Sequence, residues 1–266
     1  MSYPEQPDQT EPAIARSGQN SLSDLSADPT KWALFLDIDG TLIDLAPTPD
    51  GIVIPPDLGR HLRSVSDLLG GALALVTGRA LPYADKLFAP ESFPIAGLHG
   101  SERRRPDGSI DRIEIPEHFA ALKAELTAEA AQWPGVLVED KGAAIATHYR
   151  QAPEHQQALD ALMQRMLEKV GPSFTLQRGK MVIEIRPSHA DKGHALEAFL
   201  SEPPFAGRLP IAIGDDVTDE AMFRTVNRLG GRSIRIGDSS TETVAGELIP
   251  SAATLRTILA SLSAKL

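Results

Sequence analysis

The chain has 266 residues, of which 42% are hydrophobic, so it is long enough to bury one large core or two modest ones. Its 36 acidic and 26 basic residues give a formal charge of -10, which argues against a general affinity for nucleic acid or anionic membranes. It contains no cysteine, which excludes disulfides and thiolate metal sites and favours a reducing, cytoplasmic setting. No apolar run reaches the length that spans a membrane.

The first two segments of the chain differ in composition and in hydrophobic pattern. Residues 1–30 are rich in Pro, Gln, Ser and Asp and lack the basic start and apolar core of a signal peptide, so we expect a disordered tail. Over 31–105, short apolar runs alternate with helical periodicity. Strands are predicted at 33–36, 72–76 and 94–98, and helices at 57–69 and 81–88. This βαβ rhythm predicts a parallel sheet with a ligand site at the carboxyl ends of its strands.

The pattern of predicted elements changes between 106 and 187, where we expect an inserted α+β cap. Its predicted helices cover 117–132 and 153–170, and two predicted hairpins join strand 136–139 to 143–149 and strand 174–177 to 181–186. Arg103, Arg104 and Arg105, just before the insertion, are expected at the tip of a solvated turn. An insertion that leaves one strand end and returns to the sheet is placed to cover the ligand site.

The βαβ rhythm returns from 188 to 266. Helices are predicted from 192, over 219–226 and from 252, and strands over 211–213 and 233–236. Right-handed crossovers would pack this part and 31–105 into one parallel sheet. The sequence therefore predicts an α/β fold with a Rossmann-like core, split into 31–105 and 188–266 by the cap.

Two carboxylates stand directly after the first predicted strand. Asp37 and Asp39 are separated by one residue and followed by Gly40. Alternate residues of a strand point to opposite faces, so the two carboxylates converge only where the strand ends and Gly40 lets the backbone bend. Such a pair suits phosphate-ester chemistry. One carboxylate attacks phosphorus while a divalent cation offsets its charge, and the other transfers a proton to the leaving oxygen.

Two further motifs offer groups for a phosphoryl oxygen. Thr77, Gly78 and Arg79 follow strand 72–76 and supply a hydroxyl and a free backbone N–H beside a glycine. Lys192 opens a helix just after the cap and can supply a positive charge. Taken singly, the first motif is a common loop composition and the lysine is a typical solvated residue.

An acidic cluster follows strand 211–213. It consists of Asp215, Asp216 and Asp219, whose carboxylate oxygens are the hard ligands that Mg2+ prefers. Asp215 and Asp216 could also cap the helix that begins nearby, and the two roles can coexist.

Together and in this order, the four motifs resemble those of the haloacid dehalogenase superfamily. The resemblance implies that Asp37 is a nucleophile that forms an aspartyl-phosphate and that Asp39 acts first as acid and then as base. It further implies that Thr77 and Lys192 hold the transferring oxygens, with Gly78 and Arg79 as substrate contacts. Mg2+ would be held by the Asp37 side chain, the Asp39 carbonyl and Asp215, with Asp216 or Asp219 in support.

One segment just before the predicted cap and three within it are similar to segments of the trehalose-6-phosphate phosphatases, a family within that superfamily. These segments lie around 98–102, 138–142, 146–150 and 179–187. The resemblance implies hydrolysis of trehalose 6-phosphate to trehalose and phosphate. The residues it implies for the substrate are Glu139, Lys141 and Glu184 on the glucose distal to the phosphate, and His148, Arg150 and Arg178 nearer the active cleft. Lys180 is expected as a further substrate contact.

The cap residues also have structural explanations. Glu139 and Lys141 flank a predicted hairpin turn, where exposed charges are ordinary. Glu184 lies opposite its two isoleucine neighbours and could point to water. His99 is expected as a loop or core residue rather than a ligand.

Two rival functions remain open from the sequence. One is another sugar phosphatase of the superfamily, such as a glucosyl- or mannosyl-phosphoglycerate phosphatase. The other is a regulatory protein that accepts phosphate on Asp37 or binds the sugar without turnover, although such a protein has no need of an acid at Asp39. In each case we expect a monomer that binds a small sugar phosphate, and neither nucleic acid nor a membrane.

Overall fold

The computed structural model describes residues 16–45, 52–179, 181–188 and 190–264, which form two β-sheets. Within these residues, nine strands form the larger sheet, in the spatial order β1 (Arg16–Ser17), β13 (Glu247–Ile249), β12 (Arg232–Ile236), β11 (Leu209–Gly214), β2 (Trp32–Leu36), β3 (Leu73–Val76), β4 (Ile95–Gly97), β5 (Glu102–Arg104) and β6 (Ile110–Arg112). From β1 to β4 all neighbours are parallel, whereas β5 and β6 are antiparallel additions at one edge.

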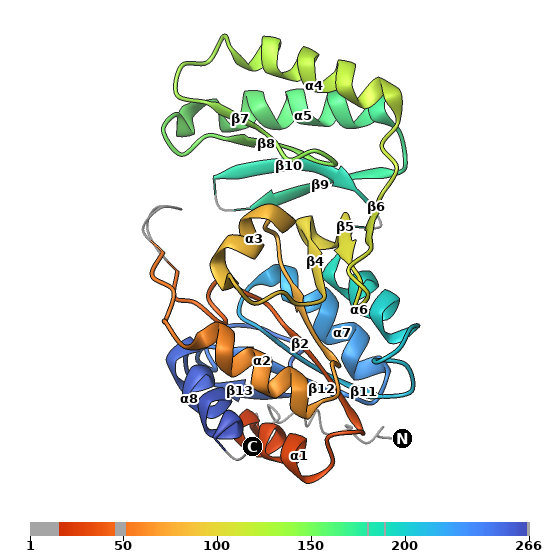
Figure 1. The fold of residues 1–266 in the computed structure, drawn as a ribbon. Coiled ribbons are helices and arrows are strands. Elements are labelled where there is room, and N and C mark those ends of the chain that lie inside the picture. Colours follow the sequence, from red (N-terminus) through yellow and green to blue (C-terminus); the bar gives the residue numbers. More distant parts are fainter. Residues whose placement is uncertain (1–15, 46–51, 180, 189, 265–266) are drawn as a thin grey trace, which may run out of the picture.

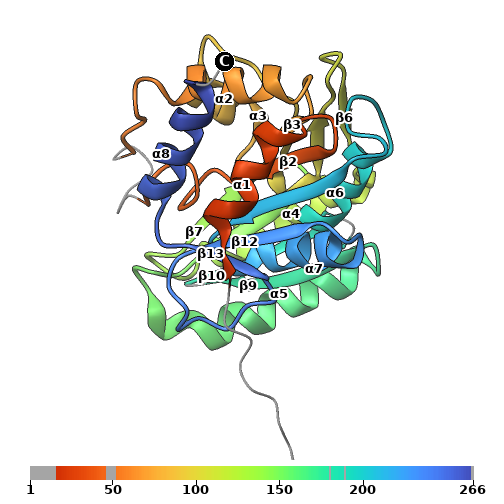
Figure 2. The same cartoon turned by 90° about the horizontal axis from the view of Figure 1, so that it is seen from below.

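The larger sheet is covered by helices on both faces, as a parallel sheet requires. Figure 2 shows α1 (Gly18–Ala27), α2 (Leu58–Leu68) and α8 (Ala252–Ser263) on one face and α6 (Lys192–Leu200) and α7 (Glu220–Arg228) on the other. The remaining core helix is α3 (Leu81–Phe88), which packs beside β4. Every residue of β2, at the centre of the sheet, is buried. Within the described ranges, each helix is too short or too polar to cross a bilayer.

The start of α6 is fixed by its own sequence. Asp191 stands at the N-cap in an extended conformation, and its carboxylate accepts the backbone N–H of His194 at 2.9 Å. An acidic N-cap satisfies an otherwise unpaired donor of the first turn. The N-cap at Asp191 places Lys192 at the first position of helix α6, at the edge of the sheet.

The smaller sheet belongs to the cap, residues 113–187. Its antiparallel strands lie in the order β7 (Leu137–Asp140), β8 (Ile145–His148), β10 (Val182–Pro187) and β9 (Phe174–Gly179), and α4 (Glu117–Ala130) and α5 (Gln156–Val170) cover one face. The cap has an apolar cluster of its own, which includes Phe119, Met163 and Ile185. Since side chains alternate along β10, Glu184 lies on the opposite face, which is turned toward the larger sheet in Figure 1.

The solvated turn expected at 103–105 is wrong for Arg103 and Arg104, which lie in β5 of the larger sheet, whereas Arg105 begins the turn that joins β5 to β6. β5 pairs with β4, and β6 with β5. Arg104 donates to both carboxylate oxygens of Asp85, at 2.7 and 2.8 Å, and Arg103 donates to Glu202 at 2.6 Å. Partners distant in the sequence therefore satisfy the charges, and the chain leaves the sheet only after Arg112 rather than at the expected boundary of 106.

The second half of the expected disordered tail is folded. Residues 1–15 lie outside the described residues, but α1 covers 18–27, within the 1–30 that we expected to be disordered. Leu22 and Leu25 are 0% exposed and belong to the core of the larger sheet. Two apolar side chains spaced one helical turn apart are thus enough to dock a segment of otherwise polar composition.

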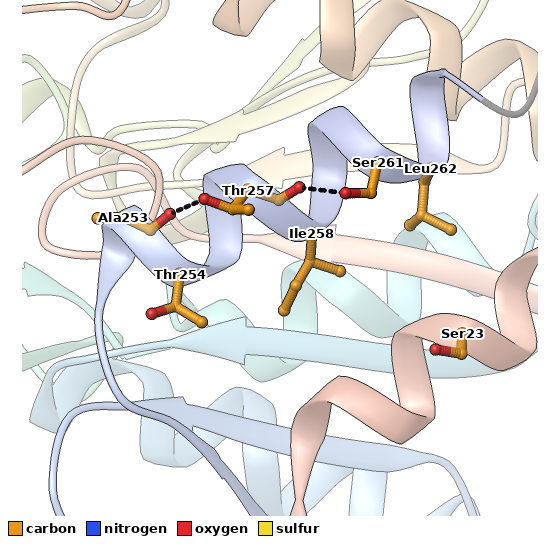
Figure 3. A pocket seen from close by; sticks show the side chains of 7 residues that line it. All are labelled: Ser23, Ala253, Thr254, Thr257, Ile258, Ser261 and Leu262. Atoms are coloured by element: carbon orange, nitrogen blue, oxygen red, sulfur yellow. Dashed lines mark hydrogen bonds between the residues drawn. The ribbon is translucent and has the colours of Figure 1, made fainter.

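A surface groove lies between α1 and α8, away from the cap (Figure 3). Its lining is small and uncharged, and consists of Ser23, Ala253, Thr254, Thr257, Ile258, Ser261 and Leu262. The hydroxyls of Thr257 and Ser261 donate to backbone carbonyls of their own helix. The groove therefore lacks the charges that a phosphoryl group requires.

Candidate active site

Three neighbouring strands of the larger sheet end at one edge, and a polar residue of the predicted motifs follows each. Asp37 follows β2, Thr77 follows β3 and Asp215 follows β11. The backbone N–H of Asp37 donates to the carbonyl of Ile213 at 3.0 Å, which ties the ends of β2 and β11 together. Parallel pairing thus gathers these side chains at the carboxyl edge, where ligands bind in open α/β sheets.

A buried charge network occupies this edge. Lys192 Nζ donates to Asp37 Oδ1 at 2.7 Å and to Asp219 Oδ1 at 2.6 Å, and all three residues are at most 4% exposed. Burial raises the pKa of Asp37 well above its usual range, against the lowering effect of Lys192. Burial alone would lower the pKa of Lys192, but the two carboxylates outweigh it and raise that pKa. Lys192 therefore stays charged and offsets the negative charge around Asp37.

The acidic residues at this edge fit a divalent cation. Asp37, Asp215 and Asp219 each offer a carboxylate oxygen, and these oxygens lie within 4.8 Å of one another. Burial raises the pKa of Asp215 to about 6, opposed by a hydrogen bond from Thr41 and reinforced by the charge of Asp219. Crowded carboxylates with raised pKa values are the environment that a hard cation relieves.

Within this cluster, the carboxylates differ in how free they are. Asp219 accepts the backbone N–H groups of Asp215 and Asp216 at 2.9 and 3.0 Å with one oxygen and Lys192 with the other. Asp216 accepts the N–H of Val217 at 2.6 Å and caps the turn Val217–Asp219. Asp37 and Asp215 are therefore the better cation ligands, and Asp216 and Asp219 hold the loop that positions Asp215.

Gly40 is required by close approach. Its φ is +80°, and a Cβ built there would lie 2.1 Å from Oδ2 of Asp215. A larger residue would be strained and would displace Asp215. The glycine expected to let the backbone bend also makes room for the acidic cluster.

Asp39 lies beside Asp37 in the chain but makes a different contact. Its carboxylate forms a two-pronged ion pair with the guanidinium of Arg79, which also stacks 4.4 Å from the ring centre of Tyr83. Burial alone would lower the pKa of Arg79, but the hydrogen bonds that it donates to Asp39 raise it. Thr77 is buried and its hydroxyl accepts the backbone N–H of Arg79 at 3.1 Å, which fixes the start of this loop.

These side chains line a cavity of about 340 Å³, here called the first cavity. Its lining residues are Asp37, Asp39, Leu45, Gly78, Arg79, His99, Lys192, Asp215, Asp216 and Thr218. The cavity joins a buried carboxylate, two cations and an acidic cluster in one accessible place. It can therefore receive an anionic group and a metal cation together.

Two ion pairs lie on the polar side of the cap. Lys141 Nζ donates to Glu184 at 2.7 Å, and His148 Nε2 lies 2.8 Å from Glu139. Glu184 is 8% exposed, so it does not point to open water. The hydrogen bond with His148 lowers the pKa of Glu139, against the raising effect of burial. All four residues come from β7, β8, β10 and the turn after β7.

The other basic residues expected in the cap are placed less uniformly. Arg178 is exposed and paired with Asp160 of α5 at 2.7 Å, and it lines a second cavity, described below. Arg150 is exposed and lines neither the first cavity nor that second one. Lys180 lies outside the described residues.

A comparison with protein-family models gives a match over most of the chain. A family model described as trehalose-phosphatase matches residues 35–249. The chain belongs to the trehalose-phosphatase family. It is therefore an enzyme of the phosphoric monoester hydrolase class, as the sequence predicted.

Two curated relatives in the trehalose-phosphatase family cover most of the chain. A probable trehalose-phosphate phosphatase of Sinorhizobium fredii is 60% identical over 249 residues, 94% of each chain. The trehalose-6-phosphate phosphatase of Escherichia coli is 45% identical over 213 residues, 80% of each chain.

Solved structures carry the same fold at lower identity. The C-terminal domain of trehalose-6-phosphate phosphatase from C. albicans is 18% identical, with a TM-score of 0.77 over 96% of this chain and 99% of that one. A trehalose-6-phosphate phosphatase from Aspergillus fumigatus is 23% identical, with a TM-score of 0.71 over 95% of this chain and 99% of that one. The predicted fold, a Rossmann-like haloacid dehalogenase core with an inserted α+β cap, is confirmed.

The structure adds three residues that the sequence did not single out as ligands. His99, Gln177 and Arg186 line a second cavity between core and cap, together with Arg178, Asp191, Lys192, Val217, Thr218, Ala221 and Arg224. His99, expected as a loop or core residue, has a left-handed φ of 56° and lies against Gly78, where a Cβ would come within 2.7 Å of its ring. Its place after β4, the next strand beyond β3, was the signal available in the sequence.

Proposed function

We propose that this protein hydrolyses trehalose 6-phosphate to trehalose and phosphate. The observation that carries the proposal is the buried Asp37, held 2.7 Å from Lys192 at the wall of a cavity that also contains the acidic cluster. The names of the relatives, trehalose-phosphate phosphatases at 60% and 45% identity, support this substrate.

Asp37 is proposed as the nucleophile. Its carboxylate oxygen attacks phosphorus, a P–O bond to Asp37 forms, and the bond from phosphorus to the sugar oxygen breaks. Lys192 opposes the effect of burial on the pKa of Asp37 and is close enough to share its charge with a phosphoryl oxygen. The hydroxyl of Thr77 and the backbone at Gly78 are proposed as further donors to the phosphoryl group.

Asp39 is proposed as the acid and then the base. It gives a proton to the departing sugar oxygen, and it later takes a proton from the water that attacks phosphorus and releases Asp37. Its carboxylate is paired with Arg79 in the present structure, so substrate must draw that guanidinium away. The phosphate oxygens are a suitable new partner for Arg79, because guanidinium groups bind such oxygens in pairs.

Mg2+ is proposed as the cation of the acidic cluster, held by Asp37, Asp215 and the backbone carbonyl of Asp39. The hard oxygen donors and their mutual repulsion support this choice. When bound, such a cation offsets the charge of the phosphoryl group and so lets the carboxylate of Asp37 approach. Asp216 and Asp219 are proposed to support the ligand loop through the hydrogen bonds described above.

The cap is proposed as a separate domain that closes over the sugar. Glu139, Lys141 and Glu184 would bind the glucose distal to the phosphate, since ionised groups make strong hydrogen bonds to sugar hydroxyls. His148 would orient Glu139. Arg178, which lines the second cavity, is proposed for a smaller part at the rim of the cleft, and Arg150, which lines neither cavity, is proposed to act only from the exposed surface of the cap.

Phosphate release from a panel of esters tests the proposal. With Mg2+ present, we expect kcat/KM for trehalose 6-phosphate to exceed that for glucose 6-phosphate and for glucosyl- and mannosyl-phosphoglycerate. Equal turnover of trehalose 6-phosphate and glucose 6-phosphate would contradict the assigned substrate. Binding of trehalose 6-phosphate without release from any ester would favour the regulatory alternative.

A further inference from the structure

The second cavity has a volume of about 250 Å³ and lies between the core and the cap. It shares His99, Lys192 and Thr218 with the first cavity, so the two adjoin each other. Lys192 contacts Asp37 directly. A group attached to a phosphate in the first cavity would therefore reach the second one first.

Four buried polar atoms around this cavity have no hydrogen-bond partner among the described residues. They are Nδ1 of His99, Oε1 of Gln177, and Nε and Nη1 of Arg186. Outside this cavity, the described residues contain one more such atom, Oγ of Ser101. Native proteins rarely leave buried polar atoms unpaired, because each costs about as much as a lost hydrogen bond. Their concentration at one place points to a ligand that pairs with them.

The strand register of the cap sheet explains why these atoms face the core. Gln177 of β9 lies opposite Glu184 of β10, and Arg186 is two residues further along β10. Side chains two apart point to the same face, so all three lie opposite the apolar face formed by Ile183 and Ile185. Glu184 is occupied by Lys141, whereas Gln177 and Arg186 remain available.

The chemistry of the set selects the kind of ligand. The free atoms of Arg186 donate, whereas the free oxygen of Gln177 accepts. Burial, with the charges of Lys192, Arg186 and Lys141, lowers the pKa of His99 to about 3, so its ring is neutral. A sugar hydroxyl both donates and accepts, whereas a phosphate at neutral pH mainly accepts. A mixed set of donors and acceptors therefore fits hydroxyl groups better than a second anion.

We propose that His99, Gln177 and Arg186 form a subsite for ring hydroxyls of the sugar that carries the phosphate. The inference rests on the proposed function for the identity of that sugar. It assigns discrimination between esters partly to the ring nearest the phosphorus, with Glu139, Lys141 and Glu184 acting on the distal ring.

The test compares Gln177→Leu and Arg186→Met with matched controls on α5, Gln164→Leu and Arg165→Met, whose side chains are exposed on the far side of the cap sheet. The quantity measured is the ratio of kcat/KM for trehalose 6-phosphate to kcat/KM for p-nitrophenyl phosphate, an ester without a sugar. We expect each subsite variant to lower this ratio by about tenfold or more. The control variants should have the same ratio of kcat/KM values as the wild type.

Thermal unfolding of the unliganded variants separates binding from structure. The unpaired atoms of Gln177 and Arg186 make no hydrogen bond in the unliganded fold, so replacing the polar groups that carry them with apolar ones should leave the melting temperature equal or higher. An unchanged ratio of kcat/KM values would overturn the proposal, whether or not the melting temperature falls. Loss of a second inorganic phosphate site in Arg186→Met, measured by calorimetry, with an unchanged ratio would assign the cavity to an anion instead.

The same assays distinguish this subsite from the enzyme's overall function. A wild-type protein that hydrolyses p-nitrophenyl phosphate but prefers no sugar ester would count against the proposed function. A wild-type preference for trehalose 6-phosphate that both variants retain would count against the subsite only.

Discussion

At the scale of single residues, the site depends on a lysine that contacts two buried carboxylates. Lys192 is the buried cation that contacts both Asp37 and Asp219. Removing one partner from such a group leaves an uncompensated buried charge, which is costly. Substitutions in this network must therefore be chosen to preserve its charge balance or its shape.

Asp37→Asn is the sharpest such substitution for catalysis. The amide keeps the shape but is a poor nucleophile, so we expect kcat for trehalose 6-phosphate to fall by about a thousandfold or more, with binding retained. Phosphate release and calorimetric titration of the substrate measure the two quantities. Asp107→Asn, at the exposed turn between β5 and β6, is the matched control. Turnover by Asp37→Asn near that of the control would remove Asp37 from its proposed role.

Glu139→Ala addresses the cap. Glu139 lies in β7, lines neither the first nor the second cavity, and is proposed to bind only the distal glucose. We expect KM for trehalose 6-phosphate to rise about tenfold with kcat changed little, because interactions equal in ground and transition state affect binding alone. Steady-state kinetics provide the measurement, and identical KM values for variant and wild type would exclude Glu139 from the substrate site.

His99 gives the stability of the protein a dependence on pH. Its folded pKa of about 3 lies below the unfolded value of about 6.5, so the unfolded chain binds the proton more readily. The contribution of neutral His99 is fully present above about pH 6.5 and is lost progressively as the pH falls from there toward about 3. Between pH 8 and 5.5, we expect the wild type to lose about 1 kcal/mol more free energy of unfolding than His99→Gln. Urea unfolding at the two pH values measures the difference, and equal losses would show that His99 titrates normally.

At the scale of elements, the strands and helices with strong local patterns were predictable. β2 and β3 are continuous apolar runs, and the alternation around Glu184 correctly separated its face from that of Ile183 and Ile185. The hairpin of β5 and β6 was not, because Arg103 and Arg104 acquire partners only when β5 lies beside α3 and the loop after α6.

The residues of the candidate site also divide into those that the sequence predicted as a group and those that it did not. Asp37, Thr77 and Asp215 were predictable as a group because each directly follows a strand of one parallel sheet. The grouping of His99 with Gln177 and Arg186 around one cavity was not, since the first comes from the core and the other two from the cap. Their proximity depends on how the cap sits on the core, which no local pattern encodes.

The helix α1 offers a test of what the sequence missed. Leu25 is fully buried against the core, so Leu25→Ala should leave a cavity and lower the free energy of unfolding by about 3 kcal/mol. Ser26→Ala, on the exposed side of the same helix, should change it by less than about 0.5 kcal/mol. Chemical denaturation measures both. A small effect of Leu25→Ala would mean that α1 does not contribute to the folded core.

At the scale of the whole molecule, we expect a single chain in solution. Leu137 at the start of β7, Leu229 just after α7 and Val244 before β13 are among its exposed large apolar side chains, and they come from distant parts of the sequence. The formal charge of -10 also opposes self-association. We expect sedimentation analysis at micromolar concentration to give a mass near 28.5 kDa. A stable dimer would show that some face of this surface is an interface.

The position of Lys192 in the chain has a mechanical consequence. β10 ends at Pro187 and α6 begins at Lys192, so only four residues join the last strand of the cap to the cation beside the nucleophile. A connection this short has little slack, so the proposed closure of the cap would pull on the first turn of α6. The ammonium group of Lys192 would then move with the cap, and one motion would change both the contacts to the sugar and the charge near the phosphorus.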